Sequence, residues 1–518
     1  MPIRLEPDDP QSGGQRPQNN NTGGGGGLGP LLKFLPLVLL FVFKRPKLLI
    51  PILLVGGAWY FFFGGQEMLS GGVTESGGDF SLGAALSEER YDKAEVFEPL
   101  AYGSFNQMPA RVSLEQYAPT RRHQGQQGSC VGWASAYSAR TILHAKATGQ
   151  NPNSVAFSPA YLYNQIALDG CQGAYMLDAM KTMQQGGALP FNQFRYDDQS
   201  CSASPNSSQR RDAQQYKIKG FNRLSEGGEE YGPDIQGIRQ NLAQGAPVVI
   251  GMMVGGTFMS RMVGQKVWYP TQGDYSMRGF SGHAMCVIGY DDNLDGGALQ
   301  LMNSWGEDWG DRGMAWVRYK DFVHFTKEAY GLYPMGSSTQ QAADQNKLAV
   351  EFGLLDMATE KTIAMRQAGD LVFKTVNPVK KGDKFKILLA NSIECYTYVF
   401  GQETDGSSYV LFPYTEKHSP YCGITGTRLF PKDESLKADD LGNSDFMAIV
   451  ISKTQLDAKQ FNQRINASRK GNYAEKLKEA LADQRVSSVA FQVGETIAFK
   501  ADTKGKNAVG MVLQIDKR

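Results

Sequence analysis

The sequence predicts an α+β protein in which a mainly helical segment is followed by β-rich segments. After Cys130, apolar residues recur at helical spacing until Gly149 closes the run. Apolar runs at 247–252, 281–291 and 299–302 are instead typical of buried strands. A chain of 518 residues is long enough for two hydrophobic cores and accessory segments.

The composition excludes several classes of function. Lys and Arg total 53 against 52 Asp and Glu, and no basic patch interleaves with aromatic residues, so no nucleic-acid partner is expected. The sequence has no His/Cys cluster with zinc spacing and no phosphate loop, so no metal or cofactor is expected. Residues 291–296 resemble half of a calcium loop, but Met302 stands where that loop needs Glu. A hairpin turn is the better interpretation.

The N-terminal region predicts attachment to a membrane. Residues 1–27 are polar and Gly-rich and are predicted to be disordered. Residues 28–65 hold two apolar runs, 34–43 and 48–63, on either side of the basic cluster 44–47. The second run approaches the ~20 residues that a spanning helix needs, so one or two membrane segments are expected.

Whether one or both apolar runs span the membrane, the rest of the chain lies on the same side of the membrane. Basic clusters stay in the cytoplasm, so the chain beyond the anchor should be periplasmic or extracellular. A secretory signal peptide is the competing interpretation, but no small-residue cleavage site follows the apolar run. Residues 66–107 are rich in Gly, Ser and Glu and are predicted to form a stalk.

The stretch 124–134 has the pattern expected around a nucleophile. A turn rich in Gly and Gln leads Cys130 into the first turn of a helix. Unpaired N–H groups and the helix dipole both favour a thiolate there. One cysteine alone is a weak signal, because buried cysteine is usually a small hydrophobe. Two later stretches strengthen it: 281–291, which contains His283, and 302–313, which contains Asn303 and Trp305.

Taken in this order across 108–335, the three blocks resemble the papain-like cysteine peptidases, here in a bacterial, membrane-anchored form. The resemblance implies a two-lobed fold with a helical lobe, a twisted β lobe and the active site in the cleft between them. It implies Cys130 as the nucleophile and His283 as the proton carrier. Asn303 would orient His283, and Gln124, with the Cys130 amide, would bind the oxyanion.

The same resemblance implies substrate-binding positions at Gly173, Ala174, Gly282, Ala284 and Trp305. Small residues there let a substrate backbone approach closely, and the indole shields the bond between His283 and Asn303 from water.

This chain also departs from the family pattern. Gln127 replaces a cysteine and Val131 replaces a tryptophan, although neither change removes a catalytic group. The predicted stalk is too short and polar for the usual helical inhibitory pro-segment.

The remaining cysteines fit an oxidising compartment. Cys171 and Cys201 occupy positions that resemble half-cystines of the helical lobe, and Cys395 and Cys422 lie together near the C-terminus. Two disulfides are therefore expected, leaving Cys286 in the core of a strand.

Residues 336–347 are predicted to link the peptidase region to a β-rich C-terminal domain at 348–518. Strands are expected at 385–389, 395–400 and 446–452, with one helix at 472–484. The segment resembles an uncharacterised β-sandwich domain found on bacterial peptidases, and what it binds, including any protein partner, stays open.

The sequence thus predicts a membrane-anchored cysteine endopeptidase, a hydrolase acting on peptides or proteins. Two alternatives use the same residues differently. One is an acyltransferase or amidase, and the other is a non-catalytic, papain-shaped binding module. The full set of Cys130, His283, Asn303 and Gln124 argues against the binding module, which has no need of all four.

Overall fold

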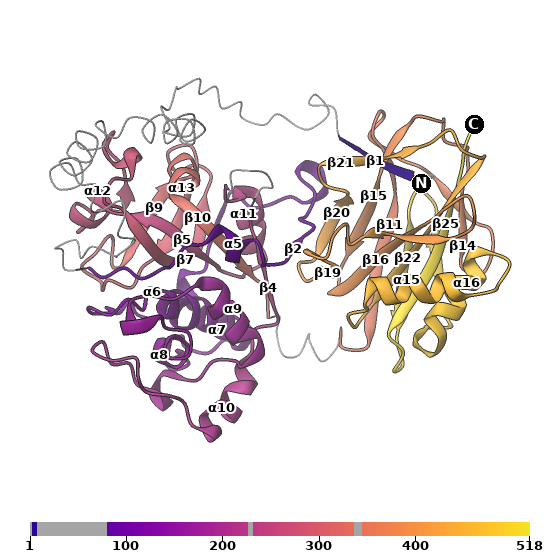
Figure 1. Cartoon of the computed structure of the whole chain (residues 1–518). Helices are drawn as coiled ribbons and strands as arrows, with labels where there is room; N and C mark the ends of the chain where they lie inside the picture. The colour runs from indigo at the N-terminus through magenta and orange to yellow at the C-terminus, as the bar shows by residue number, and fades with distance from the viewer. Residues whose placement is uncertain (1–2, 8–79, 226–231, 336–343) are drawn as a thin grey trace, which may run out of the picture. The chain divides into compact units, whose positions relative to one another are not determined.

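The computed structural model describes residues 3–7, 80–225, 232–335 and 344–518 (Figure 1). The predicted membrane anchor at 28–65 lies outside these residues. Within the described ranges, no helix has both the length and the apolar character to cross a membrane.

The helix that carries Cys130 has three continuous parts. It begins as α6 (Cys130–Gly132), continues through a π-helical segment (Trp133–Arg140) and ends as α7 (Thr141–Thr148). Gly149 ends it in the left-handed conformation with φ of 71°, as its sequence position predicts.

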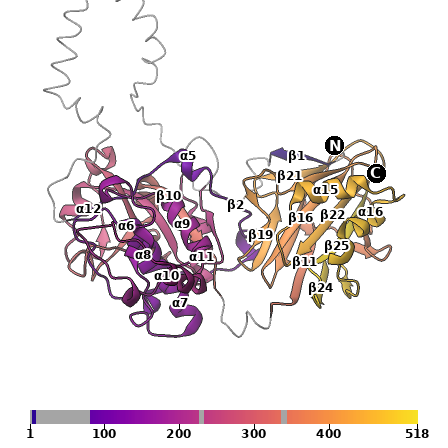
Figure 2. The ribbon, with the colours of Figure 1, turned by 60° about the horizontal axis from the view of Figure 1, so that its bottom comes forward.

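Helix α8 (Pro159–Tyr163) begins with a serine cap followed by proline. Ser158 accepts a hydrogen bond from the Tyr161 N–H, and Pro159 occupies the first helical position. The other helices of this lobe are α9 (Met176–Gln185) and α10 (Ser207–Ala213). With α6, α7 and α8 they cluster together in both views (Figures 1 and 2).

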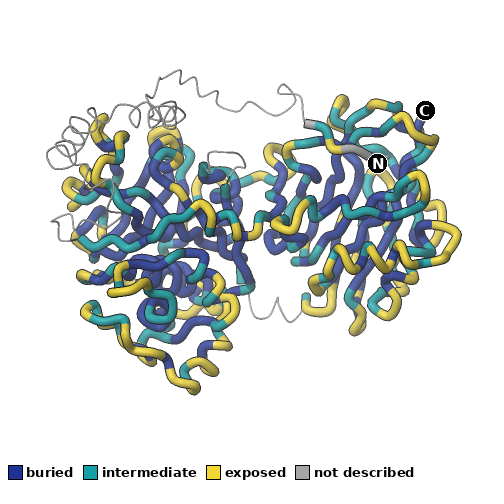
Figure 3. Tube along the Cα trace, viewed as in Figure 1, coloured by how far each residue is buried: buried dark blue, intermediate teal, exposed yellow. Residues whose placement is uncertain are grey.

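The β lobe is built on one mainly antiparallel sheet. Its strands are, in spatial order, β18 (His418–Ser419), β2 (Val96–Phe97), β4 (Phe221–Arg223), β10 (Thr326–Leu332), β5 (Val248–Val254), β7 (Ser281–Asp291), β8 (Ala298–Met302), β9 (Met314–Arg318) and β6 (Val267–Trp268). Strand β3 (Arg111–Ser113) pairs with β7. The near-continuous apolar runs of β5 and β7 follow from burial of both strand faces (Figure 3). Helices α11 (Ile235–Ala243), α12 (Gly256–Ser260) and α13 (Tyr319–Phe325) complete the lobe.

The prediction of a stalk at 66–107 is wrong from residue 80 onward. This part contains α5 (Glu88–Tyr91) and β2, and its apolar residues enter the core of the two lobes. Tyr91 is buried, and its hydroxyl exchanges hydrogen bonds with the backbone O and N–H of Ala329 at 3.0 and 3.1 Å. These long-range contacts outweigh the polar composition on which the stalk prediction depended.

The C-terminal region is a two-sheet structure, which agrees with the predicted sandwich-like domain. One sheet holds β21 (Glu434–Ala438), β15 (Lys384–Asn391), β11 (Lys347–Asp356), β24 (Ile497–Asp502) and β23 (Phe491–Val493). The other holds β14 (Val372–Thr375), β25 (Ala508–Asp516), β22 (Ser444–Ser452), β16 (Cys395–Gln402) and β17 (Ser408–Phe412). Side chains from both sheets form one core.

Two features of this region were not predicted. The sequence predicts α16 (Tyr473–Leu481) but not α15 (Ala458–Ala467), which packs Phe461 and Ile465 against the second sheet. In addition, residues 3–7 of the supposedly disordered tail form β1 (Ile3–Pro7), which pairs with the edge strand β21. Edge pairing is available even to short polar segments, because it uses backbone groups.

One of the two expected disulfides is present. Cys171 and Cys201 are bonded, with Cα atoms 5.8 Å apart. Cys395 and Cys422 lie opposite each other on β16 and β19 (Tyr421–Cys422), but both thiols are free, so the second pairing is wrong. These buried thiols make a hydrogen bond instead, which together with burial raises the pKa of Cys395.

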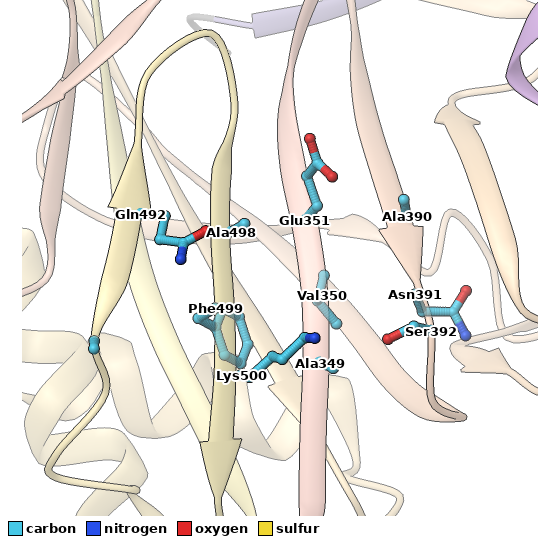
Figure 4. Close-up of a pocket in the computed structure, with 11 residues that line it drawn as sticks. Ala349, Val350, Glu351, Ala390, Asn391, Ser392, Gln492, Ala498, Phe499 and Lys500 are labelled. Carbon is cyan, nitrogen blue, oxygen red and sulfur yellow. The ribbon is translucent and has the colours of Figure 1, made fainter.

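The first C-terminal sheet carries a depression of about 480 Å³ (Figure 4). It is lined by Ala349, Val350, Glu351, Ala390, Asn391, Ser392, Ala490, Gln492, Ala498, Phe499 and Lys500. The lining contains no cysteine or histidine, and Glu351 already accepts a hydrogen bond from Thr496. A partner for this domain therefore stays a prediction.

Candidate active site

Packing between α6 and β7 brings the predicted nucleophile and proton carrier together. Cys130 begins α6 and is fully buried. Its Sγ accepts a hydrogen bond at 3.4 Å from the N–H of Ala284, the residue that follows His283 on β7. Ala284 was predicted to lie at the substrate site, and the structure places it directly against the sulfur.

Asn303 holds the ring of His283, as the resemblance implies. The distance from Nε2 of His283 to Oδ1 of Asn303 is 2.7 Å. An amide oxygen only accepts, so Nε2 must carry the proton. Nδ1 is then left as an unprotonated acceptor, buried and without a partner among the described residues. Nδ1 is therefore the ring nitrogen with acceptor capacity, and it accepts no hydrogen bond from the Cys130 thiol in this structure.

Trp305 protects this bond from water. Its ring stacks on His283 with 4.4 Å between centroids, and only 1% of the residue is exposed. A hydrogen bond shielded in this way keeps more of its electrostatic strength than an exposed one. The role predicted for Trp305 agrees with this geometry.

Gln124 lies in the same site, and its side chain is hydrogen-bonded to neighbouring residues. Its Oε1 accepts a hydrogen bond from the Ser304 hydroxyl at 2.7 Å, and its Nε2 donates to the Gln127 carbonyl at 2.9 Å. The hydroxyl of Tyr196 also donates to its backbone carbonyl. Its side chain is therefore fixed, with one of its two amide N–H groups donated to Gln127 and the other left for the oxyanion role that the resemblance assigns.

Burial keeps both reacting groups neutral here. It raises the pKa of the Cys130 thiol to about 12 and lowers the pKa of His283 to about 4, while the bond to Asn303 partly opposes the second shift. The expected thiolate is therefore absent from this state. The N-terminal position of Cys130 favours ionisation only where solvent or substrate reaches the site.

The segment 80–86, here called the strap, contacts the residues that were predicted to line the cleft. At its start, Phe80 stacks on Trp305 at 4.8 Å, and the indole N–H donates to the Ser81 carbonyl at 2.9 Å. Further along, Gly83 and Ala84 both donate to the Gly282 carbonyl, at 3.3 and 3.1 Å.

The strap also forms backbone hydrogen bonds with Ala174, another of the predicted substrate-binding residues. The N–H of Ala174 donates to the Gly83 carbonyl at 3.0 Å, and Ala85 donates to the Ala174 carbonyl at the same distance. A Cβ on Gly173 would lie 2.7 Å from the Gly83 oxygen. The predicted substrate-binding positions 173, 174, 282 and 305 are thus the surfaces that the strap covers.

Gly83 allows the strap to lie this close to the turn that precedes Cys130. Its φ of 150° lies in the region that favours glycine, and a Cβ there would be 2.2 Å from the Gly128 carbonyl oxygen. This contact lies two residues before Cys130. The strap thus rests directly on the turn that presents the nucleophile.

Several residues of the site were missed from the sequence. Ser304 and Tyr196 position Gln124, and the strap covers the cleft although no inhibitory segment was expected. The small residues 83–85 were the available signal, since glycine and alanine suit close backbone approach.

The two departures from the family pattern leave the site intact. Gln127 donates to the Asp197 carbonyl at 3.2 Å, and Val131 is buried. The calcium-like stretch is a turn between β7 and β8, in which Asn293 donates its N–H to Asp291. No group of three or more potential metal ligands occurs within the described ranges.

The family model described as "Papain family cysteine protease" matches residues 108–333. These residues form a papain-family cysteine peptidase domain. Mouse cathepsin K is 28% identical over 204 residues, which cover 38% of this chain and 56% of that protein. A cysteine protease of Blomia tropicalis is 24% identical over 243 residues, covering 44% and 66%. The chain thus spans roughly half to two thirds of these relatives.

Among solved structures, xylellain, a cysteine protease from Xylella fastidiosa, is similar. It shares 22% identity with a TM-score of 0.40, over 49% of this chain and 96% of that one.

Gly83→Ala should open the cleft of the peptidase domain. The added Cβ collides with the Gly128 carbonyl, so the strap is expected to lose several of its backbone contacts, and the rate of Cys130 alkylation to rise about tenfold or more. Labelling with iodoacetamide, mapped by mass spectrometry, measures this rate.

The matched control is Gly103→Ala. Gly103 also has a positive φ, of 71°, but a Cβ there meets nothing within 4 Å. It should leave the Cys130 labelling rate near that of the unaltered chain. Equal labelling rates in the unaltered chain, Gly83→Ala and Gly103→Ala would show that the strap does not limit access of the reagent to Cys130.

The pH dependence of labelling should separate the covered and open states. With its pKa raised to about 12, the covered thiol ionises tenfold more for each pH unit, so labelling of the unaltered chain should still be rising at pH 9. In Gly83→Ala, hydration lowers the Cys130 pKa, and labelling should level off nearer neutrality. A plateau below pH 8 in the unaltered chain would contradict the covered state.

Proposed function

We propose that this chain is a membrane-anchored papain-like cysteine endopeptidase whose catalytic domain lies outside the cytoplasm. The observation that carries the proposal is the 2.7 Å bond between His283 and Asn303, which leaves Nδ1 as the acceptor nitrogen of His283, the residue next to the Ala284 N–H that contacts the Cys130 sulfur. This contact supports a site in which nucleophile, base and orienting group act together in covalent catalysis.

The first step forms an acyl-enzyme. Once the strap leaves the cleft, Nδ1 of His283 accepts the proton from the Cys130 sulfur. The thiolate attacks the carbonyl carbon of a bound peptide, and the negative charge moves to the carbonyl oxygen. The backbone N–H of Cys130 and Nε2 of Gln124 then stabilise this oxyanion. The Gln124 amide has two N–H groups, so it can donate one to the oxyanion while the other stays on the Gln127 carbonyl.

The second half returns the enzyme to its starting state. His283 donates its Nδ1 proton to the leaving amine, the C–N bond breaks and a thioester remains on Cys130. A water molecule loses a proton to His283 and attacks the thioester, which releases the acid product and restores the thiol. Throughout, Asn303 keeps the ring in one orientation, and only groups of this chain and water take part.

The location outside the cytoplasm has two supports. One is the pair of apolar runs at 34–43 and 48–63 around a basic cluster. The other is the disulfide between Cys171 and Cys201, because such bonds persist mainly in oxidising compartments.

Cys130→Ala tests the proposed chemistry. An epoxide inhibitor of papain-type thiolates should label Cys130 in the unaltered chain and in Gly83→Ala. The alanine variant should lose the label and at least about 10⁴-fold of its cleavage rate, since no other group supplies the nucleophile. Mass spectrometry locates the label, and a mixed peptide library measures cleavage.

Other outcomes of this experiment would change the function assigned. Labelling at Cys130 with transfer of acyl groups to an added amine, but no hydrolysis, would indicate an acyltransferase. No labelling in either protein would indicate a papain-shaped binding module.

The anchor has its own prediction. The full chain should stay with membranes after a carbonate wash, and added protease should digest its C-terminal domain in cells stripped of any outer envelope but with an intact plasma membrane. Removal of 28–65 should release the chain to the soluble fraction, because these residues supply the apolar surface. Retention in the membrane without them would contradict the assigned anchor.

A further inference from the structure

Residues 3–7, which precede the predicted membrane anchor in the sequence, take part in the fold of the C-terminal domain. They form β1, and all five residues pair antiparallel with β21, residues 434–438 (Figure 1). On its other side β21 pairs with β15. The other strands described in this sheet all come from residues 347–502. β1 is therefore a strand that the chain supplies to this sheet from before the anchor.

Side chains on both faces of β1 contact the C-terminal domain. One carboxylate oxygen of Glu6 is 2.8 Å from Nζ of Lys437, and the other is 3.8 Å from Nζ of Lys384. Leu5 points to the opposite face of the strand and, with Tyr414, lines a cavity of about 490 Å³. A shift by one residue would exchange the two faces, so the contacts of Leu5 and Glu6 together specify the register of β1.

The pairing also gives β21 a partner on its outer side. Without β1, the outward N–H and C=O groups of residues 434–438 would form an open sheet edge, on which strands of other chains can add. The backbone of β1 pairs along this whole edge. The domain is therefore complete only when residues 3–7 can reach it.

Strand pairing requires that residues 3–7 and 434–438 lie on the same side of the membrane. A single crossing by the second apolar run, 48–63, would instead separate them. In that case the chain could form β1 only if residues 8–27 crossed the bilayer a second time. That stretch is rich in Asn, Gln and Gly and includes three charged residues, so it is unsuited to the hydrocarbon core. A single crossing is therefore incompatible with β1.

We propose that residues 28–65 form a membrane hairpin, with the basic turn 44–47 at the cytoplasmic face, so that residues 3–7 and the C-terminal domain both lie outside the cytoplasm and pair there. The inference rests on the membrane anchoring of the proposed function. It selects two membrane segments over the single segment that the sequence also allows. The edge of β21 thus receives the part of the chain that precedes the hairpin.

The sequence of the anchor is compatible with two short crossings. Residues 28–43 and 48–63 are each 16 residues long, which as helices would measure about 24 Å against a hydrocarbon core of about 30 Å. Local thinning of the bilayer accommodates such a difference. Lys33 lies near the outer end of the first run, where its long side chain can reach the interface, and the turn 44–47 carries the cluster of positive charge that stays in the cytoplasm.

A disulfide cross-link tests whether the two strands meet outside the cytoplasm. Leu5 and Leu436 are directly opposite, and opposite residues of antiparallel strands have Cα atoms about 4.5–5.5 Å apart, within the range of a disulfide. In cells that express the full-length chain, Leu5→Cys combined with Leu436→Cys should therefore become oxidised. The bond closes a loop of about 430 residues, so the band shifts on a non-reducing gel after free thiols are blocked. In the cytoplasm the same pair would stay reduced.

The matched control combines Leu5→Cys with Val376→Cys. Val376 is exposed and follows β14 in the other sheet of the same domain, so this pair should give no cross-link within the chain. A cross-link of equal yield in the control would show that the bond does not report strand pairing, and would overturn the assignment drawn from it.

A second measurement locates each side of the hairpin and does not depend on substitutions in the sheet. A membrane-impermeant maleimide is added to cells that lack any outer envelope but keep an intact plasma membrane. Ser12→Cys should be labelled at once, whereas Lys47→Cys should be labelled at least about tenfold more after the membrane is permeabilised. The background from the unaltered chain should be low, because the free cysteines among the described residues are all buried.

The outcomes separate the inference from the proposed function. Ser12→Cys that reacts only after permeabilisation, or Lys47→Cys that reacts in sealed cells, would overturn the hairpin while leaving the anchor and the peptidase intact. Absence of the cross-link between positions 5 and 436, with both thiols intact, would overturn it too. Loss of the chain from carbonate-washed membranes would instead refute the anchor and the hairpin together, whatever the reactivity of Cys130.

Discussion

The site depends on one packing contact, that of the N-terminus of α6 against β7. It brings together Cys130 and His283, which are 153 positions apart in the sequence. The contact is specific because the Ala284 N–H is directed at the sulfur while the adjacent ring is held by Asn303. A shift of β7 by one residue would turn His283 to the other face of the sheet. Burial of both strand faces makes such a shift costly.

The chemistry of the site could be predicted from sequence because each part lies in a short local pattern. Cys130 follows a turn rich in Gly and Gln at a helix start, and Asn303 precedes Trp305 in one continuous block. The resemblance to the papain family placed these blocks in one cleft. The bond between Asn303 and His283 and the stacked indole agree with that assignment.

The strap could not be predicted, because it depends on contacts between distant parts of the chain. Ser81 meets Trp305 across 224 positions, and Ser87 meets Glu328 across 241. Composition suggested a stalk, since the stretch is rich in Gly and Ser. Composition does not show that Tyr91 is buried between β-lobe strands and fixes the segment. In the C-terminal domain, the sequence placed Cys395 near Cys422, but proximity alone did not decide whether they would bond.

Electrostatics link the strap to the reactivity of the site. A cysteine at a helix N-terminus is expected to ionise readily, yet here burial outweighs the dipole and raises the Cys130 pKa to about 12. The same segment that excludes substrate therefore also excludes the water that would stabilise a thiolate. When the strap covers the cleft, it prevents substrate binding and lowers the nucleophilicity of Cys130 at the same time.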